Sequence, residues 1–330
     1  MKIKNITIQN FKSIGFIDII EPNPFTVFVG PNGAGKSNIF EAMEFWSFQH
    51  KGYREDSISL FGGVENILHY DDLEYVLNVS LEFPDEIIID SYGLVVDSLE
   101  GKPLKILTEQ SLLNIERFTG SEYYKQFVKN YSRLFINNPK GNKLNLQDDS
   151  KLTLISNNLE KVLGRILKDE VKKEDILDWL SMFIPEFEDV FIESTRSKDE
   201  LIVKEKFSTK DFRKEMLSDG TYNILALLTA VFQSDEPQFL CIEEPENGLT
   251  PYVIREMVTL FRNACEEKGH YIWLNTHSQS LVSELTADEI ITVNKIKGET
   301  KIKQFKGKDF HGLRMDEAWL TNTLGGGLPW

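Results

Sequence analysis

Residues 30–37 read Gly30-Pro31-Asn32-Gly33-Ala34-Gly35-Lys36-Ser37, a glycine-rich stretch that ends in lysine and serine. The residues before it, 25–29, are mostly aromatic or β-branched, which predicts a buried strand. After it, over residues 38–46, apolar residues recur at helical spacing. A strand, a glycine loop and a helix in this order are typical of a phosphate-binding loop. The sequence therefore predicts that the chain binds a nucleoside triphosphate.

Each residue type in this loop has a physical role. The glycines allow backbone N–H groups to curl inward around a phosphate chain. We expect Lys36 to reach the β- and γ-phosphates and the hydroxyl of Ser37 to ligate Mg²⁺. The N-terminus of the following helix adds a partial positive charge. The residues expected to bind the nucleotide are Gly30, Asn32, Gly33, Ala34, Gly35, Lys36, Ser37 and Asn38.

Composition narrows the class of protein. With 330 residues, of which 41% are hydrophobic, the chain can form one large α/β domain or two smaller ones. No apolar run reaches membrane-spanning length and the first residues do not look like a signal peptide, so we expect a cytoplasmic protein without a membrane partner. The two cysteines, Cys241 and Cys265, are too few for a disulfide framework or a zinc site.

The net charge of −15 argues against a general nucleic-acid coat, because affinity for phosphate backbones comes from many Lys and Arg contacts. A local basic strip is nevertheless present around a turn expected at Gly298-Glu299. It has two interpretations: a surface that binds DNA, or a solvated edge hairpin whose lysines discourage aggregation. The strip comprises Lys295, Lys297, Lys301, Lys303, Lys306 and Lys308.

A second strand delivers two acids. Residues 239–242 are fully apolar and lead directly into Glu243 and Glu244. Such a pair suits metal-assisted phosphoryl transfer, because the first acid can hold Mg²⁺ and the second can orient the attacking water. The alternative interpretation is a helix cap and a surface charge, which the presence of a phosphate loop disfavours.

Two further segments complete the order of motifs. Residues 217–221, Leu-Ser-Asp-Gly-Thr, precede an apolar helix and by themselves indicate only a helix N-cap at Ser218. Residues 271–274 form another expected buried strand, and His277 follows it. A histidine at the end of a core strand can contact a γ-phosphate and sense its presence.

In this order the motifs resemble those of an ATP-binding-cassette ATPase of the SMC/RecF/OLD-like class. More closely, the chain is similar to the prokaryotic family of stand-alone predicted ATPases of this class. Residues 8–13 match that family's first strand and turn, residues 179–192 resemble its middle region, and Trp319-Leu320 with residues 324–326 resemble its C-terminal signature. Residues 50–150 carry little of the resemblance.

The resemblance implies that ATP and Mg²⁺ are the cofactors and gives each matched residue a role. Lys36 and Ser37 would hold the phosphates and Mg²⁺, with Glu243 as the metal-associated acid. Glu244 would be the catalytic base, and His277 would occupy the switch position. Asn247 and Leu249 would lie in the loop that communicates across a dimer.

Other matched residues lie outside the phosphate loop and the paired acids and would also contact the nucleotide. Ser218, Asp219 and Gly220 would complete the γ-phosphate site of the opposite protomer. The turn at Phe11, Lys12 and Ser13 lies where relatives contact the base. Two residues depart from the transporter pattern: Glu243 replaces an aspartate and Asp219 replaces a glycine. The candidates for a metal-sensing glutamine are Gln110 and Gln147.

The expected fold class is α/β, an ABC-ATPase head with a mixed central sheet that carries the phosphate loop, an antiparallel N-terminal β part and a helical insertion. We expect one domain over residues 1–330, with a helical or insert subdomain at about 97–215 inside it. Within that range the pattern predicts a helix near 109–118, a helical stretch over 159–183 and a hairpin formed by 190–194 and 201–206. No sustained heptad repeat lies between Asn38 and Leu217, so no coiled-coil arm is expected, nor is an added nuclease domain.

The expected function is ATP hydrolysis at an ATP-dependent homodimer. In this dimer the phosphate loop of one protomer and the signature residues of the other, Ser218 to Gly220, enclose the same nucleotide. By analogy with relatives, the protein would be a switch that controls a separate effector protein in bacterial anti-phage defence. Two alternatives remain open. One is a RecF-like DNA-repair or DNA-sensing ATPase, and the other is a nucleotide-binding scaffold without turnover.

Overall fold

The computed structural model describes residues 2–51, 53–69, 77–84, 88–91, 94–95, 105–106, 122–136, 150–195 and 198–325. The helix expected near 109–118 and both glutamine candidates, Gln110 and Gln147, lie outside these residues. Within them, no helix is long and apolar enough to span a membrane. The first half of the chain contains β1 (Asn5–Phe11), β2 (Ile14–Ile20), β3 (Phe25–Val29), α1 (Lys36–His50), α2 (Arg54–Leu60), α3 (Val64–Ile67), β4 (Asn78–Glu82), β5 (Ile88–Ser91), β6 (Leu94–Val95), β7 (Lys105–Ile106), α5 (Glu122–Asn130) and β8 (Tyr131–Leu134).

The second half of the chain contains the other helices and strands. These are α6 (Leu159–Ile166), α7 (Glu170–Phe183), β9 (Phe187–Ser194), β10 (Asp199–Glu205), β11 (Phe212–Arg213), α8 (Asp219–Phe232), β12 (Phe239–Glu243), α9 (Pro251–Lys268), β13 (Tyr271–Thr276), α10 (Gln279–Val282), β14 (Ile290–Ile296), β15 (Glu299–Gln304) and α11 (Met315–Leu320). Two short 3₁₀ turns, Lys214–Met216 and Ala287–Glu289, precede α8 and β14 in the described part.

The central sheet is mixed, as predicted. Among the described residues it has six strands in the order β15-β14-β3-β13-β12-β8. All neighbours from β14 to β8 are parallel, whereas β15 pairs antiparallel with β14. Because β3, β12 and β13 are parallel, their carboxyl ends meet at one edge of the sheet. The phosphate loop follows β3, Glu243 and Glu244 lie at the end of β12, and His277 follows β13. The topology therefore brings these residues together.

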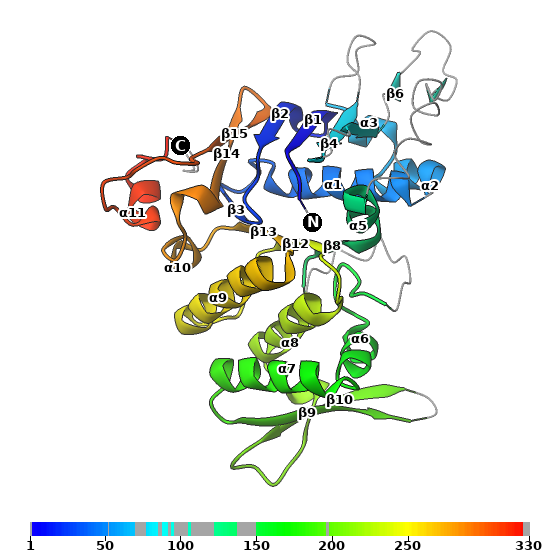
Figure 1. The fold of residues 1–330 in the computed structure, drawn as a ribbon, viewed down its shortest axis with the longest axis vertical. Helices are drawn as coiled ribbons and strands as arrows, with labels where there is room; N and C mark the ends of the chain where they lie inside the picture. The colour runs from blue at the N-terminus through cyan, green and yellow to red at the C-terminus, as the bar shows by residue number, and fades with distance from the viewer. Residues whose placement is uncertain are drawn as a thin grey trace.

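Both faces of this sheet are buried, which explains why its strands are continuously apolar. In β12, Leu240 and Ile242 belong to one hydrophobic cluster, whereas Phe239 and Cys241 belong to another. The first cluster includes residues of α8 and α9, and the second includes residues of α1 and the N-terminal strands. Figure 1 shows this layering, with α8 and α9 on one side of the sheet and α1 with β1 and β2 on the other.

The antiparallel N-terminal β part is also confirmed. Its described strands have the order β2-β1-β4-β5, and each neighbouring pair is antiparallel. This sheet is linked to the central one through Gln304 in β15. The Gln304 side chain accepts from the Ile20 amide and donates to the Ile20 carbonyl, both at 3.0 Å.

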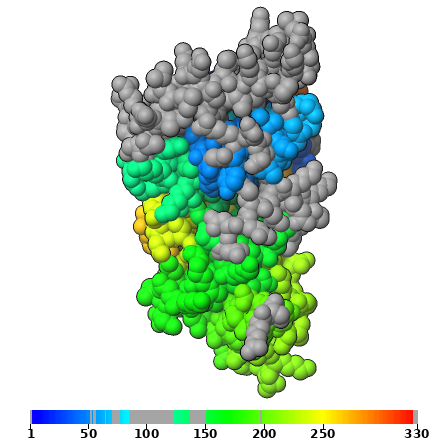
Figure 2. All heavy atoms as spheres, turned by 90° about the vertical axis from the view of Figure 1, so that its right-hand side faces the viewer, coloured from blue at the N-terminus to red at the C-terminus, as the bar shows by residue number. Residues whose placement is uncertain are grey.

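The insertion differs from the expectation in two ways. The helical pattern over 159–183 forms two helices, because α6 ends at Ile166 and the carboxylate of Asp169 accepts from Val171 N–H and caps a new helix, α7. In addition, β8 lies within the predicted range of 97–215 yet belongs to the central sheet, where it pairs with β12. The expected hairpin is confirmed as β9 and β10, and β11 extends it to a three-stranded antiparallel sheet among the described residues. In Figure 2 the coloured residues of α6, α7, β9 and β10, green to yellow-green, lie towards one end of the molecule.

Candidate functional site

The phosphate loop connects the end of β3 to the start of α1, as the sequence predicted. Gly33 and Gly35 have φ values of 76° and 100°, a backbone conformation that favours glycine. Space also demands glycine at position 35, because a Cβ there would lie 2.0 Å from Oγ1 of Thr300. The conformation of the loop therefore favours glycine at both positions, and position 35 has no room for a side chain.

Lys36 points back into the loop rather than into solvent. Its Nζ donates to the carbonyl oxygens of Gly30 at 2.8 Å and Pro31 at 3.1 Å, and lies 3.2 Å from Nε2 of His277. Burial lowers the pKa of Lys36 to about 8. Burial and the neighbouring Lys36 also lower the pKa of His277. Two groups that can contact a phosphate therefore face each other across the loop.

Ser37 and Glu243 are brought together from opposite halves of the chain. The Ser37 hydroxyl donates to Oε2 of Glu243 at 2.5 Å, and the Asn275 side-chain amide donates to the same oxygen at 3.2 Å. Hydroxyl and carboxylate oxygens are the ligands that Mg²⁺ prefers. The residues present thus fit a magnesium ion at the end of the loop.

Glu244 has a left-handed backbone conformation, with φ at 47°. Its N–H donates to both the backbone oxygen and the side-chain Oδ1 of Asn275, each at 3.1 Å. Its carboxylate accepts from the Asn247 amide at 3.0 Å and lies 3.8 Å from Nε2 of His277. A strained conformation of a non-glycine residue persists only where neighbouring groups hold it, as Asn275 does here.

Glu246 is a site residue that the sequence did not reveal. Its Oε1 accepts from the Thr276 hydroxyl at 2.5 Å and from the His277 N–H at 3.3 Å. Burial raises the pKa of Glu246. This side chain ties the loop after the acids to the residues that follow β13. The only available signal was an acid within the segment Pro245-Glu246-Asn247, which by itself indicates no partner.

The Leu-Ser-Asp-Gly-Thr segment forms the start of α8. The Ser218 hydroxyl accepts from Thr221 N–H at 3.1 Å, which is the N-cap that the sequence predicted. A Cβ at Gly220 would lie 2.5 Å from the carbonyl oxygen of Gly248, so this helix end packs directly on the loop after the acids. In the described part of the chain, no hydrogen bond joins Ser218, Asp219 or Gly220 to residues 30–37.

The turn at residues 11–13 lies beside the phosphate loop. Ser13 Oγ accepts from the Asn38 amide at 2.6 Å, and Lys12 forms an ion pair with Glu41. The side chain of Phe11 is fully buried in the N-terminal core, so its position does not support the predicted contact with a base. Any such contact by this turn depends on Lys12 or Ser13.

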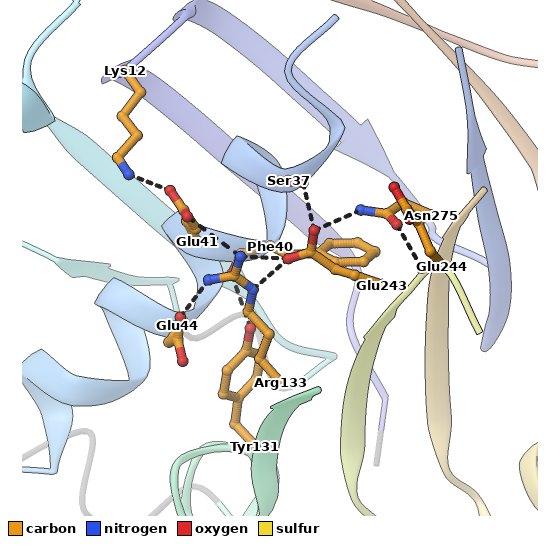
Figure 3. A network of polar contacts seen from close by, with 10 residues as sticks. All are labelled: Lys12, Ser37, Phe40, Glu41, Glu44, Tyr131, Arg133, Glu243, Glu244 and Asn275. Carbon is orange, nitrogen blue, oxygen red and sulfur yellow. Dashed lines mark hydrogen bonds and ion pairs between the residues drawn. The ribbon is translucent and has the colours of Figure 1, made fainter. Parts of the chain in front are cut away.

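Two more residues at the site lie far from the motifs in sequence. Thr300 Oγ1 donates to the carbonyl of Ala34 at 2.9 Å, from the hairpin near the end of the chain. Arg133, on β8, donates from Nε to Oε1 of Glu243 at 2.7 Å and from NH1 to Glu44 at 2.7 Å (Figure 3). The signal for Arg133 was a charged residue inside the short apolar segment 131–136.

Solved structures share this fold. An SMC head bound to the C-terminal winged-helix domain of ScpA aligns with a TM-score of 0.56 at 15% identity, covering 96% of this chain and 100% of that one. The Smc head domain with an extended coiled coil, bound to the C-terminal domain of ScpA and derived from Pyrococcus furiosus, aligns with a TM-score of 0.50 at 15% identity. The coverage there is 98% and 99%, respectively.

Sequence relatives agree with the fold. Chromosome segregation protein sudA of Emericella nidulans is 28% identical over 235 residues, which is 68% of this chain and 19% of sudA. The ATP-binding protein EcfA2 of an energy-coupling factor transporter from Mycoplasma pneumoniae is 35% identical over 88 residues, 27% of this chain and 26% of EcfA2. The chain thus spans about a fifth to a quarter of these relatives' lengths.

One family model covers most of the chain. Residues 25–283 match AAA_21, described as "AAA domain, putative AbiEii toxin, Type IV TA system". The matched segment runs from β3 to beyond α10 and includes the phosphate loop, the start of α8, the paired acids and His277. The fold, an SMC-like ATPase head, and the order of motifs agree with that match. The chain belongs to the AAA_21 family of ABC-type P-loop ATPases.

Proposed function

We propose that this protein is a Mg²⁺-dependent ATPase whose two copies enclose ATP, and that it acts as a switch controlling a separate effector protein. The observation that carries the proposal is the contact of Ser37 with Glu243 at the end of the phosphate loop. It brings together a hydroxyl and a carboxylate that would hold Mg²⁺, which would supply charge stabilisation to phosphoryl transfer, next to Lys36 and Glu244.

The site residues divide the chemistry among them. Lys36 and His277 would contact the γ-phosphate, and Mg²⁺ held by Ser37 and Glu243 would neutralise negative charge that develops during transfer. Glu244 would orient and polarise the attacking water as general base. Its left-handed backbone and its contacts with Asn275 and Asn247 hold its carboxylate near His277.

The position of Ser218 and Gly220, the signature residues, supports the proposed dimer. Ser218 and Gly220 contact their own helix and the loop at Gly248, so a second copy would have to bring them to the nucleotide. The contact between Gly220 and Gly248 would then couple the signature to the loop that follows the catalytic acids. ATP would close this dimer, and hydrolysis would release it.

The effector role rests on the comparisons. The family description names a putative toxin of a type IV toxin–antitoxin system, which supports a place in defence against phage. Both SMC heads were solved with fragments of ScpA, which supports a head that acts on a partner protein.

A RecF-like role in DNA repair has less support. The lysines of the basic strip are partly engaged within the chain: Lys301 pairs with Glu299, Lys303 donates to the Leu324 carbonyl, and Lys306 pairs with Glu21. A scaffold without turnover would not require the contacts that hold Glu244 and His277 in place.

The test uses Glu244→Gln, which keeps the shape of the side chain and removes the base. We expect turnover to fall by about 10²–10⁴-fold, while sedimentation velocity shows a monomer-to-dimer shift on adding Mg-ATP. Lys36→Ala, which removes the phosphate-binding amine, should not shift. Turnover at the wild-type rate in Glu244→Gln, or no ATP binding by the wild type, would contradict the proposal.

A further inference from the structure

One buried arginine joins three carboxylates behind the metal-binding acid. Arg133 contacts Glu243 through Nε and NH2, Glu44 through NH1 at 2.7 Å, and Glu41 through NH2 at 3.3 Å. The Arg133 side chain is 5% exposed, that of Glu243 2% and that of Glu44 8%. Figure 3 shows the guanidinium between β12 and α1, with carboxylates on both sides.

The two oxygens of Glu243 have different partners. Oε1 accepts from Arg133, whereas Oε2 accepts from Ser37 at 2.5 Å and from Asn275 at 3.2 Å. Two donors from one planar guanidinium, Nε and NH2, reach Oε1 and therefore restrict rotation of the carboxylate. Oε2 is consequently the oxygen that remains directed at the end of the phosphate loop.

The same arginine anchors α1, the helix that begins at the phosphate loop. Glu41 and Glu44 lie on α1, and Ser37 is at its N-terminus. Arg133 thus links the strand that carries Glu243 to the helix that carries Ser37. Burying a guanidinium with its charge is costly unless its donors are satisfied, which the three carboxylates achieve.

We propose that Arg133 is a positioning residue for Mg²⁺: it orients the Glu243 carboxylate so that Oε2 and the Ser37 hydroxyl form the protein side of the metal site. This inference rests on the proposed function, because it requires that the site bind Mg-ATP. Arg133 itself touches neither the metal nor the nucleotide. Mutation of a partner that orients a metal ligand in this way lowers metal affinity or activity by about 10–100-fold.

The test is Arg133→Lys, which keeps the positive charge and removes the two-donor geometry. Binding of a fluorescent ATP analogue is titrated with Mg²⁺, and also measured in EDTA. We expect the Mg²⁺ concentration for half-maximal effect to rise by about 10–100-fold, with binding in EDTA equal to that of the wild type. A purely structural defect would lower binding in both conditions.

A second pair of variants removes the same charge from two positions and so tests whether the contact with Arg133 matters. Glu44→Gln and Glu41→Gln each remove one negative charge near Arg133, but Glu44 makes the shorter contact. We expect Glu44→Gln to shift the Mg²⁺ midpoint more than Glu41→Gln does, and this pair decides the question if Arg133→Lys does not fold. Equal midpoints in the wild type and the folded variants would overturn the inference. Failure of the wild type to respond to Mg²⁺ would instead overturn the proposed function.

Discussion

The ε-amino group of Lys36 lies 3.2 Å from Nε2 of His277, so the phosphate loop and the end of β13 meet through a lysine and a histidine. Burial lowers the pKa of both groups, that of Lys36 to about 8. At alkaline pH, therefore, only a fraction of the Lys36 side chains is protonated and positively charged. An anion bound beside it would restore that charge, because opposite charges favour the ionised form.

ATP affinity should consequently depend on pH. Below pH 8 Lys36 is already protonated, so its contribution is constant. Above that value, binding must take up a proton, and the dissociation constant should rise by about tenfold per pH unit. Calorimetry at pH 9 in buffers of different ionisation enthalpy measures this uptake. Lys36→Arg stays charged throughout and serves as the control; an equal slope in that variant would contradict the prediction.

The hydroxyl of Thr300 should matter for the phosphate loop. In Thr300→Val the Ala34 carbonyl loses its 2.9 Å hydrogen bond, and leaving such a buried group unpaired costs about 1–3 kcal/mol. We expect a lower free energy of unfolding and weaker ATP binding. Thr292→Val is the matched control, because the Thr292 hydroxyl is buried on the paired strand without a hydrogen-bond partner. Equal losses in the two variants would show that the hydroxyl of Thr300 has no special role.

Gly220→Ala tests the contact between the signature helix and the loop after the acids. The added methyl would lie 2.5 Å from the Gly248 carbonyl oxygen, so α8 or the loop must move. We expect ATP-dependent dimerisation to be lost in sedimentation velocity while ATP binding to the monomer persists, since in the described residues no hydrogen bond joins Gly220 to residues 30–37. Normal dimerisation would count against a role of this helix end at the interface.

His270 should make the protein sensitive to acid. It is fully buried, and burial lowers its pKa from 6.5 to about 4. Between these values the unfolded state binds more protons than the folded state, so stability falls as the pH falls through this window. The total loss should be about 3 kcal/mol. Chemical denaturation at several pH values should show a flatter profile for His270→Gln; parallel profiles would refute this.

Local pattern was enough for the core of the site. The strand, loop and helix at residues 25–50 form from neighbouring residues, whose apolar spacing and glycines determine their conformation. The same holds for the apolar strand β12 that ends in Glu243 and for the N-cap at Ser218. The fold class came from the family resemblance that these ordered motifs carry, and the mixed central sheet confirms it.

Local pattern was insufficient where two signals compete. Over residues 159–183 the helical pattern continues through Asp169, yet α6 ends at Ile166 and the Asp169 carboxylate caps a second helix, α7. At Phe11, in the turn that the resemblance places near a nucleotide base, packing against Phe45 and Phe61 places the aromatic ring in the core. Hydrophobic burial outweighs a surface role for such a ring.

The sequence by itself determined the strand and loop before α1, the strand that ends in Glu243 and the helix cap at Ser218, since each of these involves only neighbours in the chain. Only the tertiary structure decided their partners: Arg133 meets Glu243 across 110 positions, and Thr300 meets Ala34 across 266. Those contacts depend on which strands lie next to one another. Strand order is set by the packing of the whole sheet, whereas residue spacing reports only on each strand separately.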